Sequence, residues 1–481
     1  MRGPAVTLAF LFATIGLASA ATGTEVAALR EPHVVMVAPF VILLLAIALM
    51  PFIHKHHWEN HYPKVAISLA LIVAAYYVVV LHNPARMLTT LVEYTGFMAL
   101  VGSLFVIAGG IHINMTGRST PAANTGLLAL GAILANVIGT TGASMLLIRP
   151  FLRINKHRAA PFQVVLFIFI VSNVGGALTP IGDPPLFLGY LKGVPFFWLL
   201  KVPQVLAAWL LCVGVLLGLF FVMDTINFKK HGGKVADPTK DRIELEGSHN
   251  FIFLIVIIGL VLLQKQEWLK GIQGWPIFEA MGQALGWASE KAADSFISVV
   301  IAALMIGTAC LAYKFSNRDA LKENEFSFGP IQEVGFLFVG IFATMVPALD
   351  LLETHAAALG INTVREFFWG SGALSSVLDN APTYLNFLTA AFGLQHLSLE
   401  NPAHVKMFLA DPQTWQYVVA VSLGSVFFGA NTYIGNGPNF MVKSIAESHG
   451  AKCPSFFGYV VKYTLPILIP LFALVSWLVL R

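Results

Sequence analysis

The stretch from Ser172 to Phe187, SNVGGALTPIGDPPLF, constrains the fold of this chain more than any other part of the sequence. It follows directly on the apolar run FQVVLFIFIV at 162–171, yet it contains three glycines, three prolines and an aspartate. Gly and Pro interrupt a helix, and hydrocarbon offers no water to the backbone groups that are released. Such an interruption is stable only where protein or a wet cavity surrounds it. The stretch therefore predicts a broken helix that lines a site.

The second half of the chain contains a related stretch. An offset of 253 positions aligns Ser172–Phe187 with SVFFGANTYIGNGPNF at 425–440, and 8 of the 16 columns are identical. Two interrupted hydrophobic segments at corresponding places in two halves indicate the binding site of a transporter built from repeats. We therefore expect the two stretches to lie together.

The composition is that of a polytopic membrane protein. Of the 481 residues, 57% are apolar and only 11% are charged, whereas a soluble domain carries about 25% charged residues. The net charge of +4 is small and indicates no nucleic-acid partner. The three cysteines lack metal-like spacing, and no nucleophile elbow, phosphate loop or zinc signature is present. The sequence thus favours neither an enzyme nor a protein with a bound cofactor.

The first 20 residues have the pattern of a signal peptide. They contain Arg2, then an apolar run, then the small residues Ala18, Ser19 and Ala20. The apolar run is too short to cross a bilayer, so a removable secretory signal over residues 1–20 is expected. An uncleaved amphipathic anchor is the alternative.

Hydropathy predicts ten spans, two of them broken, and two regions that resemble hairpins dipping into the membrane and returning. The spans are expected at 36–53, 65–82, 87–113, 162–191 (broken), 195–223, 251–264, 297–313, 330–350, 415–442 (broken) and 456–480. The hairpins are expected at 124–148 and 366–390, and an amphipathic interfacial piece at 265–295. This divides the chain into a first repeat (21–223), a cytoplasmic loop (224–250) and a second repeat (251–481).

The basic residues orient these segments. Lys and Arg gather in the connections at 54–64, 149–160, 224–250, 314–322 and 443–452. The positive-inside rule then places those connections in the cytoplasm and the mature N-terminus outside. The two hairpins enter from opposite sides, so the two five-span halves are inverted relative to each other. The expected fold is an all-α polytopic membrane protein of two inverted five-span repeats, each with a re-entrant hairpin and a broken helix.

Two acidic residues at membrane depth are candidate site residues. Asp183 lies in the first break and Asp379 in the second hairpin, directly before Asn380. A buried carboxylate is costly without a partner, so such residues are functional candidates by default. Carboxylate, amide, hydroxyl and carbonyl oxygens together suit a hard cation such as Na⁺, and a proton could occupy the same carboxylate. The structural alternative is that each aspartate caps the helix that follows it.

Neutral polar residues in the same four segments are candidate ligands. Asn436 replaces the acid in the second break, so the two halves are chemically unequal. The alternative role of these side chains is to hydrogen-bond the irregular backbone itself. The candidates are Asn136, Thr140, Thr141, Asn173, Thr383, Asn431 and Thr432.

These motifs carry a resemblance to a known family. The stretches SNxGGAxTPIGDPP and GxNTYIGNGPN, with SSVLDNAPT and ANVIGTTGAS in the two hairpins, resemble the ion-transporter superfamily. This superfamily includes sodium/proton antiporters of the NhaD type, citrate and dicarboxylate transporters, and arsenite exporters. The resemblance covers nearly the whole mature chain and implies an elevator-type secondary transporter, usually a homodimer.

The resemblance also implies roles for individual residues. Ser172 and Asn173, with Thr140 and Thr141, would border a first ion site. A second site would be bordered by Asn380, Pro382, Thr383, Asn431, Thr432 and Gly435. The motif TPIGD, from Thr179 to Asp183, and the pair Asp379-Asn380 are antiporter-like, whereas the repeated Ser-Asn-Thr triplet of carboxylate carriers is absent.

The leading functional hypothesis is a Na⁺/H⁺ antiporter of the bacterial inner membrane. It rests on two membrane-depth acids and on the absence of a membrane-depth Arg or Lys suited to a polyanion. A cation-coupled citrate or dicarboxylate transporter is the alternative, because half-helix N-termini can bind carboxylates without Arg. A non-transporting membrane sensor or scaffold is a third hypothesis, although the sequence offers no sizeable soluble output domain.

Overall fold

Helices make up nearly all of the structure, a computed structural model that describes residues 31–116, 119–232, 242–264, 271, 274–285 and 287–480. Within this part of the chain, eight helices are long and apolar enough to cross a membrane. The protein is therefore an all-α polytopic membrane protein, as the sequence predicts. The expected signal peptide at 1–20 lies outside the described residues.

Every predicted span has a helical counterpart. The helices of the first half are α2 (Ala38–Ile53), α3 (Lys55–Ala75), α4 (Pro84–Gly109), α5 (Pro121–Asn155), α6 (Pro161–Ile170), α7 (Pro184–Leu191), α8 (Trp198–Lys201) and α9 (Pro203–Lys230). Proline at the first helical position starts many of them, because its missing N–H would be unpaired there anyway.

The second half has the same kinds of element. Its helices are α10 (Asn250–Leu263), α11 (Pro276–Leu285), α12 (Ser289–Phe315), α13 (Arg318–Glu323), α14 (Gly329–His355), α15 (Val364–Ser375), α16 (Asn380–Gly393), α17 (Pro402–Ala410), α18 (Trp415–Phe428), α19 (Gly437–Ser448), α20 (Phe456–Tyr459) and α21 (Ile469–Val479). A π-helical segment, Val460–Leu468, joins α20 to α21 into the last span.

The first predicted hairpin is α5, which reverses direction at Gly139. This glycine has φ 78° and ψ 155°, a conformation that breaks the helix and that favours glycine. Asn124 Nδ2 donates to Asn155 Oδ1 at 2.7 Å. A straight helix would hold these residues about 46 Å apart. The two arms of α5 are therefore antiparallel, and residue 139 is at the tip.

The second predicted hairpin consists of α15 and α16, with its tip at 376–379. The rings of Phe367 and Phe387 lie 6.0 Å apart between centroids, so the two arms pack side by side. Thr363 begins α15 with a capping box, in which its hydroxyl accepts from the Glu366 backbone and the Glu366 carboxylate accepts from the Thr363 backbone.

Both predicted broken helices are present, and their breaks have the same construction. The first separates α6 from α7 and the second separates α18 from α19. In each break, a threonine hydroxyl accepts the N–H of the glycine three residues later: Gly182 N to Thr179 Oγ1 at 3.2 Å, and Gly435 N to Thr432 Oγ1 at 3.1 Å. The 253-residue offset seen in the sequence is thus a structural equivalence.

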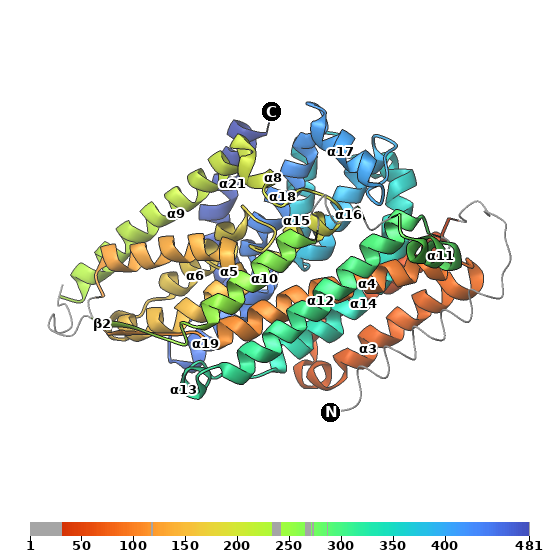
Figure 1. Cartoon of the computed structure of the whole chain (residues 1–481). Coiled ribbons are helices and arrows are strands. Elements are labelled where there is room, and N and C mark those ends of the chain that lie inside the picture. The colour runs from red at the N-terminus through yellow and green to blue at the C-terminus, as the bar shows by residue number, and fades with distance from the viewer. Residues whose placement is uncertain are drawn as a thin grey trace.

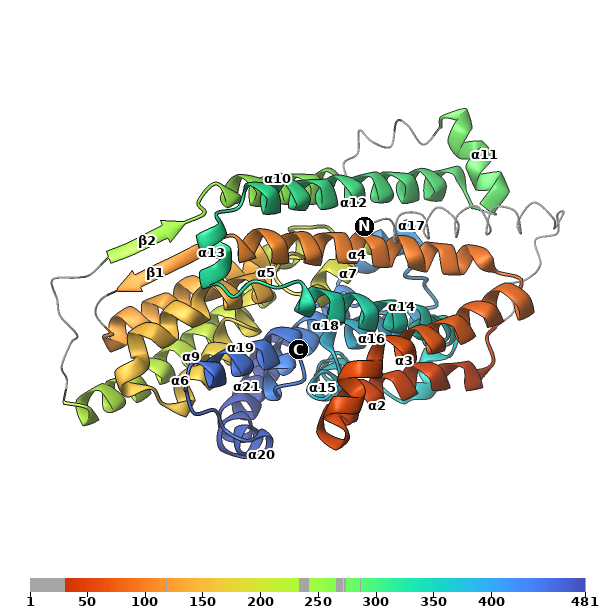
Figure 2. The same cartoon turned by 90° about the horizontal axis from the view of Figure 1, so that it is seen from below.

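A small β-ribbon corrects one sequence expectation. The segment 224–250 was expected to be a polar loop, but α9 continues to Lys230 and Arg242–Glu246 forms a strand, β2. It pairs antiparallel with β1, His112–Thr116, in the register His112↔Glu246 (Figure 2). Two short strands of alternating polar and apolar residues, RIELE and HINMT, satisfy each other's backbone groups where α4 ends.

The broken helices and hairpins occupy the middle of the molecule. Helix α3 lies at one end and α9 at the other, with α5, α15 and α18 between them (Figure 1). Residues 162–170 of α6 and 418–428 of α18 are all buried. Helices buried on every side are expected only in the core, so the two breaks are surrounded by protein.

Candidate ion site

Asp183 is the point at which the four interrupted segments meet. Its side chain is fully buried, with an exposed fraction of 0%. Oδ1 accepts hydrogen bonds from Thr140 Oγ1 at 2.8 Å and from Asn436 Nδ2 at 3.0 Å. Oδ2 accepts from Asn380 Nδ2 at 2.5 Å. One carboxyl group from the first break is therefore held by the first hairpin, the second hairpin and the second break.

The two aspartates differ with respect to helix capping. Asp183 occupies the N-cap position of α7, but its side chain accepts no hydrogen bond from the first turn, which the structure describes in full. Asp379 does cap α16, because its Oδ1 accepts from the Ala381 backbone at 2.9 Å, and it is half-buried. The capping alternative therefore accounts for Asp379 and does not account for Asp183.

A chain of hydrogen-bonded asparagine side chains also links the two breaks. Asn436 Nδ2 also approaches Asn173 Oδ1 and the Ser172 carbonyl, each at 3.2 Å. Asn173 Nδ2 donates to Asn439 Oδ1 at 2.7 Å. Asn439 was not a predicted site residue, although it closes the repeated motif YIGNGPN. Its side chain fixes the second break by donating to the carbonyls of Gly429 and Thr432.

Several candidate residues hold the irregular backbone, which was the alternative stated for them. Thr179 and Thr432 donate to the carbonyls of Asn136 and Ser376, and thereby tie each break to its own hairpin tip at 2.6 Å. Thr383 donates to the Asp379 carbonyl at 3.0 Å.

The remaining candidates lie around this framework. Ser172 Oγ lies 2.7 Å from Ser144 Oγ, between the first break and the first hairpin. Thr141 is half-buried beside Thr140 at the tip of α5. Asn136 Nδ2 donates to the Gly175 carbonyl at 2.6 Å.

Two buried amide oxygens, one in the second hairpin and one in the second break, have no hydrogen-bond donor within the described part of the chain. They are Asn380 Oδ1 and Asn431 Oδ1, and both are buried. A buried acceptor without a donor is costly, and a cation would satisfy it. The orientation of Asn380 follows from its partner, because its amino group must face the Asp183 carboxyl. A carboxyl group and neutral oxygens are the ligands that Na⁺ prefers.

The described residues contain no group of three or more His, Cys, Asp or Glu side chains that could hold a metal ion. The described residues therefore offer no cluster of the kind that binds zinc or iron. No ion pair to Asp183 is present among these residues either, and its three hydrogen-bond donors are neutral. The site can offer oxygen ligands and one titratable carboxyl group.

Two charged clusters lie elsewhere and were not predicted from the sequence. The first is the ion pair of Arg158 and Asp224, whose side chains are 0% exposed and contact each other at 2.5 and 2.8 Å. Asp224 also accepts from Asn124 and Gln163. The sequence pattern assigned Arg158 to the connection at 149–160. It ended the span at 195–223 one residue before Asp224. Only the packing of η3 (Lys156–Arg158) against α9 brings the two charges together.

The second cluster joins connections that the sequence places outside. Lys192 Nζ donates to Glu93 at 2.7 Å and to Glu400 at 2.5 Å, and Arg86 donates to Glu400 at 3.0 Å and to Asp350 at 2.8 Å. Burial alone would raise the pKa of Glu400, but the Lys192 ammonium and the Arg86 guanidinium outweigh it and hold this pKa well below its usual value.

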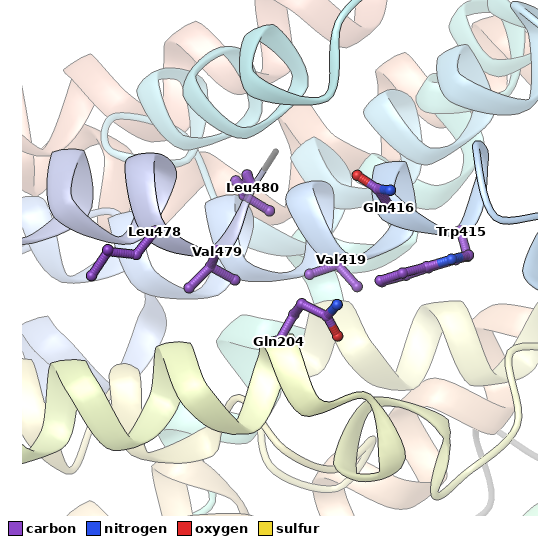
Figure 3. A pocket seen from close by; sticks show the side chains of 7 residues that line it. All are labelled: Gln204, Trp415, Gln416, Val419, Leu478, Val479 and Leu480. Atoms are coloured by element: carbon purple, nitrogen blue, oxygen red, sulfur yellow. The ribbon is translucent and has the colours of Figure 1, made fainter.

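A cavity of about 260 Å³ lies away from the site, between the start of α9, the start of α18 and the end of α21 (Figure 3). Its lining contains Gln204, Trp415, Gln416, Val419, Leu478, Val479 and Leu480. None of the candidate site residues lines it.

Comparison with known proteins agrees with the resemblance read from the motifs. The chain matches a family model described as "Putative citrate transport" over residues 29–480. A search of curated proteins finds no match. Because the family match extends over nearly the whole chain, and because the helices are those of a multi-pass membrane protein, this protein belongs to the putative citrate transport family of membrane transporters.

Proposed function

We propose that this protein is a secondary transporter that exchanges Na⁺ for H⁺, and that Asp183 binds the two ions in turn. The observation that carries the proposal is the fully buried Asp183 carboxyl, held by three neutral donors from three different segments. One carboxyl group cannot bind a Na⁺ ion and a proton at full strength together, so occupancy by one ion releases the other. Competition of this kind is the chemistry of exchange.

The two buried amide oxygens that lack a donor among the described residues support a cation near Asp183. Asn380 Oδ1 belongs to the same side chain that donates to Asp183, so a cation bound to both groups would lie between the first break and the tip of the second hairpin. Asn431 Oδ1 lies in the second break and supplies another neutral oxygen. We propose that Asp183, Asn380, Asn431 and the neighbouring hydroxyl groups of Thr140 and Thr141 contribute to ion binding.

The helix that follows Asp183 is a poor anion site. Pro184 and Pro185 are the first two residues of α7 and have no N–H groups. The Leu186 N–H already donates to the Asp183 carbonyl at 3.0 Å. The positive end of this half-helix therefore lacks the free donors that a carboxylate substrate would need. This favours a cation over an anion at Asp183.

Reconstituted vesicles with an enclosed pH-sensitive dye test the proposal. A pulse of Na⁺ or Li⁺ should move protons in vesicles with the parent protein, and Asp183→Asn should abolish the signal. Asp411→Asn is the matched control, because Asp411 is exposed and its side chain accepts only from the nearby Gln413 backbone among the described residues. The proposal is wrong if added Na⁺ and Li⁺ move no protons in the parent.

A second candidate is cation-coupled transport of citrate or a dicarboxylate, which the description of the family favours. It predicts uptake of labelled citrate that requires a cation gradient. A non-transporting sensor predicts neither flux.

We also propose, from the resemblance, that the protein acts as a homodimer in a bacterial inner membrane. Light scattering of the detergent-solubilised protein should give twice the mass of one chain, which is 52.1 kDa with residues 1–20 included, and a monomer mass would refute the dimer.

A further inference from the structure

Arg149 is a buried cation with too few partners. It lies in the second arm of α5, and 5% of its surface is exposed. Nη2 approaches Glu325 Oε2 at 3.4 Å, which is long for a charged pair. Nε and Nη1 are buried and have no acceptor within the part of the chain that the structure describes. Withdrawing a guanidinium from water is costly unless its donors are paired, so this position calls for an acceptor.

The apolar surroundings of Arg149 strengthen its attraction for an anion. One turn earlier on the same arm, Met145 packs in an apolar cluster with Phe105, Val106 and Phe326. A charge beside such a cluster is weakly screened, and its attraction for an opposite charge is correspondingly strong. Arg149 differs in this from Arg158, whose guanidinium is fully paired with Asp224 and Ser119.

The acid that faces Arg149 is poorly placed to neutralise it. The Glu325 side chain is 66% exposed, so its carboxylate remains mostly in water. Its backbone has φ 47°, in the left-handed region that residues other than glycine rarely adopt. Strained backbone of this kind persists where surrounding structure imposes it, and it is concentrated at binding sites and switches. A displaceable, strained acid therefore covers an unsatisfied base.

We propose that Arg149 is a binding site for a carboxylate group of a small organic anion, and that Glu325 occupies this site as an internal competitor. A guanidinium presents planar, forked donors that match a carboxylate, so an incoming anion can use the donors that Glu325 leaves unpaired. Binding requires Glu325 to move aside into the water that it already contacts.

This site is distinct from the one around Asp183. Arg149 and Thr140 lie on the same arm of α5, nine residues or about 14 Å apart along the helix. None of the hydrogen bonds to Asp183 involves Arg149. By the positive-inside rule, Arg149 is at the cytoplasmic end of the hairpin whose tip reaches the ion site. Carboxylate binding at Arg149 is thus separate from ion exchange and does not depend on it.

Two substitutions with opposite effects test the proposal in the detergent-solubilised full-length protein, with citrate as the probe and calorimetric titration as the readout. Arg149→Gln should weaken citrate binding by at least about tenfold, because charged hydrogen bonds are lost. Glu325→Gln should tighten it by up to about fivefold, because the competing half-exposed charge is removed. Equal affinity of the parent and Arg149→Gln, or no tightening in Glu325→Gln, would overturn the proposal.

The neighbouring ion pair gives matched controls. Arg153 and Glu323 are one turn away, 3.7 Å apart, and 40% and 56% exposed. Arg153→Gln and Glu323→Gln make the same changes of charge and should bind citrate like the parent. If they alter affinity as strongly as Arg149→Gln and Glu325→Gln, general surface charge explains the binding and the proposal fails. Should Arg149→Gln misfold, Arg149→Lys keeps the charge without the planar fork, and parent-like affinity in that variant would likewise refute a forked carboxylate site.

Two further measurements distinguish the Arg149 site from the ion site, and a carboxylate from other anions. Asp183→Asn should bind citrate with the parent affinity even though it moves no protons, whereas loss of binding would place the anion at the ion site and overturn the proposal. Inorganic phosphate should displace citrate more weakly than succinate does. Phosphate that displaced citrate better than succinate would overturn the assignment to a carboxylate.

Discussion

Replacing Asp183 by Asn and by Ala should have very different effects on stability, although both changes remove the carboxyl group. The Asp183 side chain accepts three hydrogen bonds, two at Oδ1 and one at Oδ2. In Asp183→Asn, the new carbonyl oxygen can keep both bonds at the Oδ1 position. The new amino group then faces the amino group of Asn380, which is a conflict in the parent orientation.

Asn380 can remove that conflict by a flip of its own amide. Its Oδ1 has no donor within the described residues, so after the flip this oxygen accepts from the new amino group at position 183. All three contacts are then retained as neutral hydrogen bonds. We expect Asp183→Asn to change the free energy of unfolding by less than about 2 kcal/mol, since a net hydrogen bond contributes roughly 1 kcal/mol.

Asp183→Ala offers no such repair. Of the three donors that converge on Asp183, it leaves the Thr140 hydroxyl and the Asn380 amino group buried without their acceptor, whereas Asn436 Nδ2 keeps the Asn173 side-chain oxygen and the Ser172 carbonyl. Each unsatisfied buried donor costs roughly 1–3 kcal/mol, so the loss of stability from the two unsatisfied donors should be about 2–6 kcal/mol. Thermal unfolding in detergent, followed by circular dichroism, measures the difference. Equal melting temperatures for the Asn and Ala variants would refute the argument that these three donors converge on one carboxyl group.

Three further predictions concern the framework of the molecule. Arg158→Leu should lower the free energy of unfolding by about 3–5 kcal/mol, because it leaves Asp224 buried without a cation; a loss below about 1 kcal/mol in chemical denaturation would contradict the buried pair. Gly139→Ala should destabilise the protein by roughly 1–3 kcal/mol, because φ is 78° and a Cβ would lie 3.2 Å from the Ile181 carbonyl. Gly126→Ala, in open space on the same hairpin, should instead be neutral or stabilising by up to about 1 kcal/mol, and a similar loss at both positions would rule out a special turn at 139. The folded-state pKa of Glu400 is held below its usual value, so its contribution to stability is complete above the ordinary pKa of about 4.3 and is lost as the pH falls below it. Melting temperatures between pH 7 and pH 3 should show an acid-dependent loss that is smaller in Glu400→Gln, and identical pH profiles would exclude Glu400 as its source.

The sequence was sufficient for the backbone plan. Gly and Pro at 172–187 and 425–440 break helices whatever the rest of the chain does, and the bilayer permits such breaks only inside protein. The first hairpin follows from the same rule, since Gly139 alone in α5 has a conformation that reverses the chain. The offset of 253 residues even pairs Asp183 with Asn436, which hydrogen-bond each other. The contact joins equivalent positions of the two related stretches, so it was accessible from the sequence offset.

The sequence did not separate the two aspartates. Asp183 and Asp379 each precede a helix, and in both cases a cap and a ligand were open alternatives. Capping is decided by the local backbone, and it applies to Asp379. The environment of Asp183 depends instead on Thr140, Asn380 and Asn436, which are 43, 197 and 253 residues away.

Tertiary structure alone decided the state of the charged residues. Arg149 and Arg158 stand in a basic stretch that hydropathy assigns to a cytoplasmic connection, yet one is buried and incompletely paired while the other is buried and fully paired. Local composition determines where a helix breaks, because backbone hydrogen bonds form between near neighbours. Whether a charge is buried, and which group neutralises it, depends on the helices that pack over it, and these come from distant parts of the chain.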